Sequence, residues 1–327
     1  MEFYKDNMDN TVMLSSSNCH ITKELTNEAI LYVITVVSNP SRFTKRYKLF
    51  NEFCERMKNE KNVKLISVEL QQGSRPFETN STIKVRSNDE IWFKENLINL
   101  AVRYLPNNWE YMAWIDADII FSNSSWAEDT IAALQHYHIV QMFQNAIDLG
   151  PKGEFLKNFD GFVYKYSIDN QLKSLKYAKL DGHPGYCYAT TKYGWNSIGG
   201  LFDVGILGSG DRIMLYCWLG IYESSIPKGL HHNYITYVKS YQDRCQKAIN
   251  YSIGYVKGTI LHEFHGKKKD RQYDKRWQIL VKNNYDPIAD IKKNNYGVWE
   301  FVGNKHLLIA EIKKYFSERN EDSIDLQ

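Results

Sequence analysis

Two carboxylates, Asp116 and Asp118, interrupt an apolar stretch that runs from residue 111 to residue 121. Charged groups are costly in apolar surroundings unless something offsets their charge. In a strand, residues two apart point the same way, so both carboxylates would share a face if the strand continues through them. Hard divalent cations bind carboxylate oxygens and keep open positions for phosphate oxygens. The pattern predicts a metal site, against the alternative of two aspartates solvated in a turn.

Composition places the chain among ordinary folded proteins. Its 327 residues are 43% hydrophobic, enough for a sizeable core, and the formal net charge of +3 does not by itself indicate a nucleic-acid partner. The five cysteines form no Cys-x-x-Cys pair, and their odd number favours a reducing compartment over a disulfide framework. No apolar run approaches the roughly 20 residues of a membrane span. We therefore expect a soluble, cytoplasmic protein.

Strand and helix patterns alternate on both sides of the acidic pair. Residues 31–37 form an apolar, β-branched run that ends in a turn signal, helical spacing follows, and residues 63–70 form a second apolar run. This order predicts a parallel strand–helix–strand unit with a right-handed crossover. Helical spacing returns at 91–104 and 126–136, and a strand is predicted at 139–143. We predict an α/β fold with a mixed, mostly parallel sheet flanked by helices, whose ligand binds beyond the carboxyl ends of the strands.

The order of these elements resembles a glycosyltransferase of the GT-A fold, in which a nucleotide-binding strand–helix–strand unit precedes an Asp-x-Asp metal site. Lys94 and Asn99 in KENLINLAVRYLP resemble the Lys and Asn of the helix before that motif in the large family of inverting sugar transferases. The segment YGWNSIGGLFD is similar to the Gly-Gly-Leu-Phe segment on the acceptor side of polypeptide N-acetylgalactosaminyltransferases. The layout also resembles transferase-like proteins of phages and large viruses.

The resemblance implies a nucleoside diphosphate sugar as donor, with UDP-sugar favoured, and Mn²⁺ or Mg²⁺ as cofactor. Asp116 and Asp118 would hold the metal that neutralises the departing diphosphate. His262 and His265 are candidates for a further ligand, because their segment resembles the His and Gly-Lys loop that closes many such sites; histidine favours Mn²⁺. The alternative is a basic surface loop with a core histidine. The residues expected to contact the nucleotide are Val36, Asn39, Arg42, Lys94, Asn99, Asp116 and Lys267.

An inverting transfer also needs a base that accepts the proton of the acceptor hydroxyl. Asp211 is our candidate, because ILGSGDRIML resembles the Gly-rich turn and acidic residue of galactosyltransferase-like modules, although those families usually have a Glu-Asp or Glu-Asn pair there. The helix predicted at 212–219 leaves an alternative, in which Asp211 only caps its N-terminus. The residues expected on the substrate side are His183, Tyr186, Trp195, Gly199 and Gly200, although packing alone explains any one of the aromatic ones.

Other functions share parts of this pattern. A haloacid-dehalogenase-like phosphotransferase also has Asp-x-Asp after an apolar strand, but there the motif normally comes near the start of the domain. A sugar nucleotidyltransferase would need a Gly-rich phosphate loop after the first strand, and residues 38–42 are a poor match. A further alternative is that the chain is not an enzyme and is an inactive, transferase-like binding module. The acceptor stays open among a glycan, a protein and a modified nucleic-acid base.

The expected domain organisation follows from where the periodic patterns begin and end. Residues 1–28 lack periodicity and are expected to form a peripheral arm. Residues 29–275 would form the catalytic domain, with a nucleotide-binding half at 29–145 and an acceptor half at 146–275. Residues 276–327 would form a helical C-terminal extension.

Overall fold

The computed structural model describes residues 29–168, 182–249 and 252–325 of the chain, and the predicted arm at 1–28 lies outside them. The main sheet has the strand order β10-β6-β9-β4-β1-β2-β3. Its strands are β1 (Leu31–Ser38), β2 (Val63–Gln72), β3 (Ile83–Ser87), β4 (Tyr111–Ile115), β6 (Ile139–Gln141), β9 (Cys187–Thr191) and β10 (Ile253–Tyr255). Neighbouring strands pair in parallel except at β9, which is antiparallel to β4 and β6.

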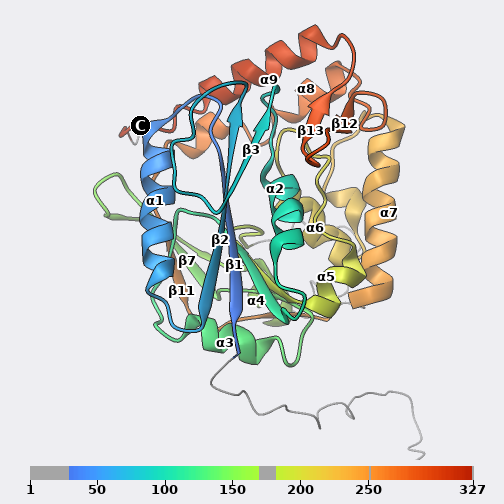
Figure 1. Ribbon diagram of the computed structural model, residues 1–327. Coiled ribbons are helices and arrows are strands. Elements are labelled where there is room, and N and C mark those ends of the chain that lie inside the picture. Colours follow the sequence, from blue (N-terminus) through green and yellow to red (C-terminus); the bar gives the residue numbers. More distant parts are fainter. Residues whose placement is uncertain (1–28, 169–181, 250–251, 326–327) are drawn as a thin grey trace, which may run out of the picture.

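Helices cover both faces of this sheet (Figure 1). They are α1 (Thr44–Lys58), α2 (Lys94–Ala101), α3 (Trp126–Ala133), α4 (Phe162–Ile168), α5 (Lys192–Ile198), α6 (Gly210–Trp218), α7 (His232–Ile249), α8 (Trp277–Lys282) and α9 (His306–Glu318). Val33 of β1 packs in one buried cluster with Phe53 of α1, and its neighbour Ile34 packs in the other with Leu97 of α2. Adjacent strand residues therefore serve opposite faces. This confirms the predicted α/β fold with a mixed, mostly parallel sheet flanked by helices.

A second, smaller sheet has the order β5-β11-β7-β8, and β12 pairs with β13 in a separate ribbon. These strands are β5 (Ile119–Phe121), β7 (Asn145–Leu149), β8 (Phe155–Asp160), β11 (Thr259–His262), β12 (Ile291–Lys293) and β13 (Trp299–Phe301).

The acidic pair lies at the junction of the two sheets, in a turn, so the strand does not continue through both aspartates. β4 ends at Ile115 in the main sheet, and β5 begins at Ile119 in the smaller one. The amide of Ile119 donates to the carbonyl of Asp116 at 3.2 Å, which closes a turn between the two strands. Asp116 and Asp118 therefore project from a turn at the carboxyl end of β4, where the carboxylates need not enter the core.

The C-terminal part of the chain packs onto the same body. Leu308, Ile312 and Phe316 of α9 are buried in one cluster with Ile213 and Trp218 of α6. Figure 1 shows α9 lying beyond the ends of β1 and β2, on the side where the C-terminal residues return to the start of α1. Residues near the end of the chain thereby reach the carboxyl ends of the main-sheet strands.

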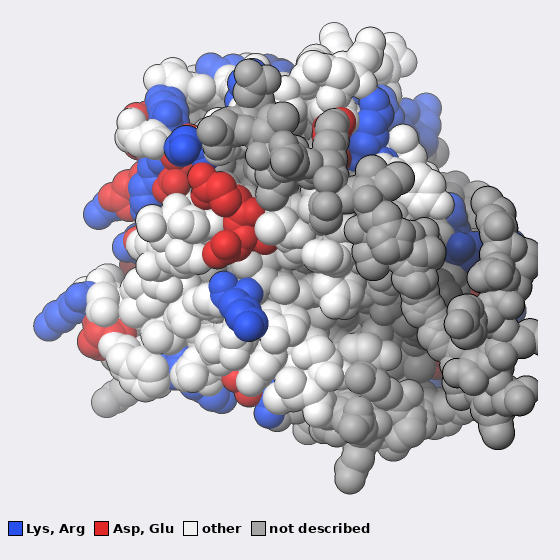
Figure 2. All heavy atoms as spheres, turned by 90° about the horizontal axis from the view of Figure 1, so that it is seen from below, with Lys and Arg blue, Asp and Glu red and all other residues white. Residues whose placement is uncertain are grey.

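The charge distribution on the surface and the polarity of the helices agree with the mild net charge of the sequence and its lack of long apolar runs. Figure 2 shows acidic and basic side chains on the same described part of one face, which does not form a continuous basic surface. Among the described helices, none is long and apolar enough to cross a membrane.

Candidate active site

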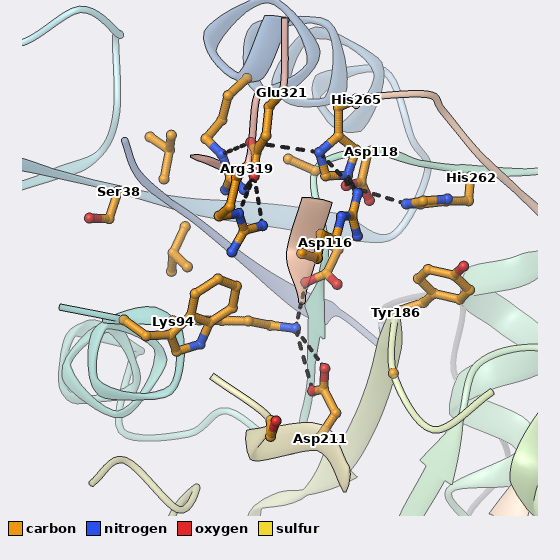
Figure 3. Close-up of a pocket in the computed structure, with 18 of the residues that line it drawn as sticks. Ser38, Lys94, Asp116, Asp118, Tyr186, Asp211, His262, His265, Arg319 and Glu321 are labelled. Atoms are coloured by element: carbon orange, nitrogen blue, oxygen red, sulfur yellow. Dashed lines mark hydrogen bonds and ion pairs between the residues drawn. The ribbon is translucent and has the colours of Figure 1, made fainter. Parts of the chain in front are cut away.

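A pocket of about 590 Å³ lies at the carboxyl ends of β1 and β4. Its wall combines the start of α1, the first residue of α2, the start of α6, the residues that follow β11 and the segment after α9. The carboxyl edge of a parallel sheet is where ligands of α/β proteins commonly bind. The pocket thus collects polar side chains from segments far apart in the sequence (Figure 3).

One end of the pocket contains a cluster that could hold a metal ion: Asp118, His262 and His265 each offer a ligand atom, and these atoms lie within 4.8 Å of one another. His265 Nε2 lies 2.6 Å from Asp118 Oδ2, and His262 Nε2 lies 3.7 Å from the same oxygen. The other oxygen, Asp118 Oδ1, is buried without a hydrogen-bond partner among the residues that the structure describes. A carboxylate and two imidazoles, with one carboxylate oxygen uncommitted, fit a divalent transition metal such as Mn²⁺.

Strand pairing explains why these residues meet. β11 runs antiparallel to β5, and its last residue, His262, lies opposite Ile119, the first residue of β5. Just beyond the strands, the amide of Glu263 donates to the carbonyl of Asp118 at 2.8 Å. The turn after β4 and the end of β11 are thereby held together by backbone hydrogen bonds, and His265 follows within one short loop.

The charges of the cluster are strongly coupled. Burial opposes ionisation of Asp118, but His262 and His265 outweigh it and hold the pKa of Asp118 well below its usual range. Burial also opposes protonation of His262, and Asp118 and Asp148 raise its pKa in spite of that. For His265, burial and then the Arg271 guanidinium lower the pKa, although Asp118 acts in the opposite direction. Metal ligation requires an ionised carboxylate and neutral imidazoles, so the pKa shifts of Asp118 and His265 favour it, whereas His262 would have to release a proton when the metal binds.

A second network occupies the middle of the pocket. Lys94 Nζ lies 2.6 Å from Asp116 Oδ1 and 3.4 Å from Asp211 Oδ1. Burial disfavours the ammonium, but Asp116 and Asp211 outweigh this and raise the pKa of Lys94. Burial raises the pKa of Asp116 to about 6. Lys94 acts in the opposite direction, whereas repulsion from Asp118 and Asp211 raises the pKa further. Lys94 thus bridges two carboxylates, while Asp116 lies outside the three-residue metal cluster.

α6 begins two residues before the predicted start, so Asp211 is its second residue and does not occupy the N-cap position. The N-cap position belongs to Ser209, which has a left-handed conformation with φ 70° and makes no side-chain cap. Gly210 lies so close to α2 that a Cβ atom there would come within 2.3 Å of Glu95 Oε1. The Asp211 carboxylate pairs with Lys94 and does not cap the helix.

Glu95, next to Lys94, is a buried carboxylate with 3% of its surface exposed. Its Oε2 accepts a hydrogen bond from Trp92 Nε1 at 2.9 Å. Burial and then repulsion from Asp211 raise the pKa of Glu95 to about 8. Glu95 is therefore expected to keep its proton near neutral pH.

Several residues predicted from the sequence do line the pocket. They include Val36 and Asn39 at the end of β1, and His183 and Tyr186 before β9. The rings of His183 and Tyr186 are stacked with centroids 3.7 Å apart, and Tyr186 OH donates to Asp148 Oδ1 at 3.0 Å. Tyr186 has φ 78°, which is unusual for a bulky residue and common at functional sites. Asn39 instead uses both ends of its amide on the backbone of Phe43.

Four predicted contacts lie away from the pocket, around α5. The Asn99 amide exchanges two hydrogen bonds, of 2.8 and 2.9 Å, with the backbone of Leu201. Gly199 and Gly200 both have positive φ and end α5. Trp195 is 7% exposed and packs edge-on against Trp114. Asn99 thereby attaches the segment after α5 to α2, and the packing and backbone geometry of these four residues explain their positions without a ligand.

Two predicted basic contacts also point elsewhere. Arg42 is exposed and lies 3.4 Å from Glu78 Oε1. Lys267 Nζ lies 3.8 Å from Asp325 Oδ2, and neither Arg42 nor Lys267 is part of the pocket wall. The next lysine, Lys268, does line the pocket and forms an ion pair with Asp148.

Sequence reasoning missed several charged residues of the pocket. They are Arg46, Asp148, Arg271, Arg319 and Glu321. Asp148 carried a usable signal, because it is a lone acid in the strand NAIDL; its Oδ1 lies 2.9 Å from His262 Nδ1. The others carried none, since a charged residue on a helix face, such as Arg46, or in a turn, such as Arg271, normally indicates a solvated surface.

Comparison with known proteins gives distant structural matches only. No family model and no curated protein matches the sequence. The catalytic domain of Drosophila beta1,4galactosyltransferase 7, solved with xylobiose, is 10% identical, with 88% of this chain and 98% of that chain covered and a TM-score of 0.34.

Two further solved structures illustrate the range of these matches. Glucosyl-3-phosphoglycerate synthase from Mycobacterium tuberculosis, solved with Mn²⁺, UDP-glucose and phosphoglyceric acid, is 10% identical over 84% of this chain and 86% of that chain, with a TM-score of 0.36. A 4-diphosphocytidyl-2C-methyl-D-erythritol synthase from Anaerococcus prevotii is 11% identical over 71% of this chain and 88% of that chain, with a TM-score of 0.32. Similarity this distant assigns no activity, substrate or metal to the chain.

Proposed function

We propose that this chain is a metal-dependent glycosyltransferase of the GT-A type, which transfers a hexose from a nucleoside diphosphate sugar, with UDP favoured, to an acceptor hydroxyl. The observation that carries the proposal is the cluster of Asp118, His262 and His265 at the carboxyl edge of the sheet, in the same pocket as Asp211. The pocket volume of about 590 Å³ falls within the range of small-molecule sites.

The described residues divide the work by position. Asp118, His262 and His265 would hold Mn²⁺, which when bound would neutralise charge on the departing diphosphate. Arg271 also lines the pocket and would add positive charge beside a bound diphosphate, whereas the charge of Arg46 is offset by Glu321. His183 and Tyr186 present a stacked aromatic wall, a surface that suits a sugar or a base.

Asp211 is the proposed base of an inverting transfer. It lines the pocket at the start of α6, and Lys94 holds its carboxylate in place from one side. A carboxylate in this position can accept the proton of the attacking hydroxyl. Asp116 shares the same lysine, so Lys94 links the proposed base to the residue beside the metal cluster.

Calorimetry with UDP tests the proposal. UDP should bind in the presence of Mn²⁺ and should lose most of its affinity when the metal is removed with a chelator, because the diphosphate would then meet Asp118 without an intervening cation. GDP and CDP serve as comparison ligands for the base. Equal UDP affinity with metal and with chelator would refute the metal-dependent role.

A further inference from the structure

Glu321, six residues from the end of the chain, is a buried carboxylate at the metal end of the pocket. It is 1% exposed and lines the pocket wall. Arg46 donates to its two oxygens at 2.6 and 2.9 Å, and Arg319 contacts Oε1 through two nitrogens at 2.7 and 2.6 Å. Burial of a carboxylate costs several kcal/mol unless such charge-assisted bonds offset it. The position of Glu321 is therefore strongly specified.

The segment around Glu321 is held on two sides. Asp322 accepts hydrogen bonds from the amides of Thr44 and Lys45, at 2.9 and 2.7 Å, and so satisfies the start of α1. On the other side the segment lies against Gly266, directly after His265. A Cβ atom at Gly266 would come within 2.8 Å of the carbonyl of residue 320, and Gly266 has φ 82°, so glycine is required there.

The two histidines of the metal cluster each lie between Asp118 and a second carboxylate. Each directs Nε2 towards Asp118 and Nδ1 towards a second carboxylate. For His262 that carboxylate is Asp148 of β7, at 2.9 Å. For His265 it is Glu321, whose Oε2 lies 3.7 Å from Nδ1, within ion-pair range but beyond hydrogen-bond distance. A terminal nitrogen of Arg271 also lies 3.2 Å from Nδ1 and 2.8 Å from Nε2 of His265. Carboxylates behind metal-binding histidines fix the ring orientation and raise the basicity of the ligand nitrogen.

We propose that Glu321 is the outer-sphere partner of His265, as Asp148 is of His262, so that one carboxylate beyond the last helix forms part of the metal site. Glu321 acts through His265 and is a positioning residue. The inference rests on the proposed metal site and extends it to a segment that follows the last helix, outside the part of the chain in which the sequence indicated a site.

The test measures Mn²⁺ affinity of the full chain without any donor, by calorimetry and by electron paramagnetic resonance of free Mn²⁺. Glu321→Gln keeps the shape of the side chain and removes its charge, and it should weaken Mn²⁺ binding about 10- to 100-fold, the usual cost of losing an outer-sphere partner. Asp148→Asn should give a loss of similar size, as a positive control. Asp322→Asn is the matched control, because it loosens the same segment but does not touch His265; its Mn²⁺ affinity should equal that of the wild type.

Each outcome of this test either supports or refutes the role of Glu321. If the wild type binds Mn²⁺ and Glu321→Gln binds it equally well, the outer-sphere role is wrong while the proposed function stands. If Asp322→Asn loses as much affinity as Glu321→Gln, the effect comes from the segment's packing and the role of the carboxylate is refuted. If the wild type binds no Mn²⁺, the metal site and this inference fail together. Should Glu321→Gln fail to fold, Arg46→Met combined with Glu321→Gln removes a cation as well and should show the same loss.

Discussion

The two aspartates of the Asp-x-Asp motif should contribute very differently to metal binding. Asp118 belongs to the three-residue cluster, and its Oδ1 is uncommitted, whereas Asp116 is engaged with Lys94 at 2.6 Å. Asp118→Asn removes the only carboxylate of the cluster. Its Mn²⁺ affinity should therefore fall by more than the loss of an outer-sphere partner, at least about 100-fold, or about 2.8 kcal/mol.

Asp116→Asn should have a smaller effect on Mn²⁺ affinity, less than about 10-fold, because it removes only a neighbouring negative charge. Its effect on folding combines two opposing terms. The variant loses the charge-assisted bond to Lys94, but it also relieves the burial and repulsion that raise the pKa of Asp116 to about 6. The free energy of unfolding should change by no more than about 1 kcal/mol.

The assay titrates Mn²⁺ into wild type, Asp116→Asn and Asp118→Asn without nucleotide, and a urea titration of each protein reports stability. Nucleotide is left out because a bound diphosphate would bring its own metal-binding oxygens to the site. Equal losses of Mn²⁺ affinity in the two variants would refute the division of roles. Both carboxylates would then bind one ion, as the sequence pattern predicted.

Two further predictions concern the acids around α6. Asp211→Asn should leave Mn²⁺-dependent UDP affinity unchanged while sugar transfer falls about 10²- to 10⁴-fold, the usual contribution of a general base; retained activity, with retained configuration in the product, would contradict the inverting role. Glu95 has a pKa raised from 4.5 to about 8, so the unfolded chain ionises first and Glu95 lowers stability as pH rises between these values. Glu95→Gln should therefore gain stability over wild type from pH 5 to pH 8, by up to about 4 kcal/mol in denaturant titrations, and a constant difference across this range would refute the shift.

Local patterns were enough to predict the frame of the fold. The apolar runs at 31–37 and 63–70 are strands of the main sheet, and the helical spacing at 126–136 corresponds to α3. Short-range periodicity is visible in one sequence, because each buried face repeats every two or 3.6 residues. The same reasoning failed at 111–121, since a continuous apolar run does not reveal that its two ends belong to different sheets.

Site residues were predictable only where their chemistry is unusual for their surroundings. Asp118 interrupts an apolar run and His262 ends one, so both stood out in the sequence. Asn99 was chosen because its helix resembles one in sugar transferases, yet its side-chain amide is hydrogen-bonded to the backbone of Leu201. Arg271 and Glu321 carry no local signal, because ordinary charged residues become site residues only when long-range packing buries them. Glu321, for example, is paired with Arg46, 275 positions earlier in the chain.

The break between β4 and β5 places the two aspartates of the Asp-x-Asp motif in different side-chain networks. In an unbroken strand, both carboxylates would face one way at a fixed spacing, and a single ion would have to serve both. The turn instead leaves Asp116 at the end of the main sheet, beside Lys94 of α2, and carries Asp118 to the smaller sheet, where β11 supplies His262. The residues proposed to bind the metal and those that position Asp211 therefore form two neighbouring networks. A change in one network should reach the other through the three-residue turn that joins them and through the repulsion between Asp116 and Asp118.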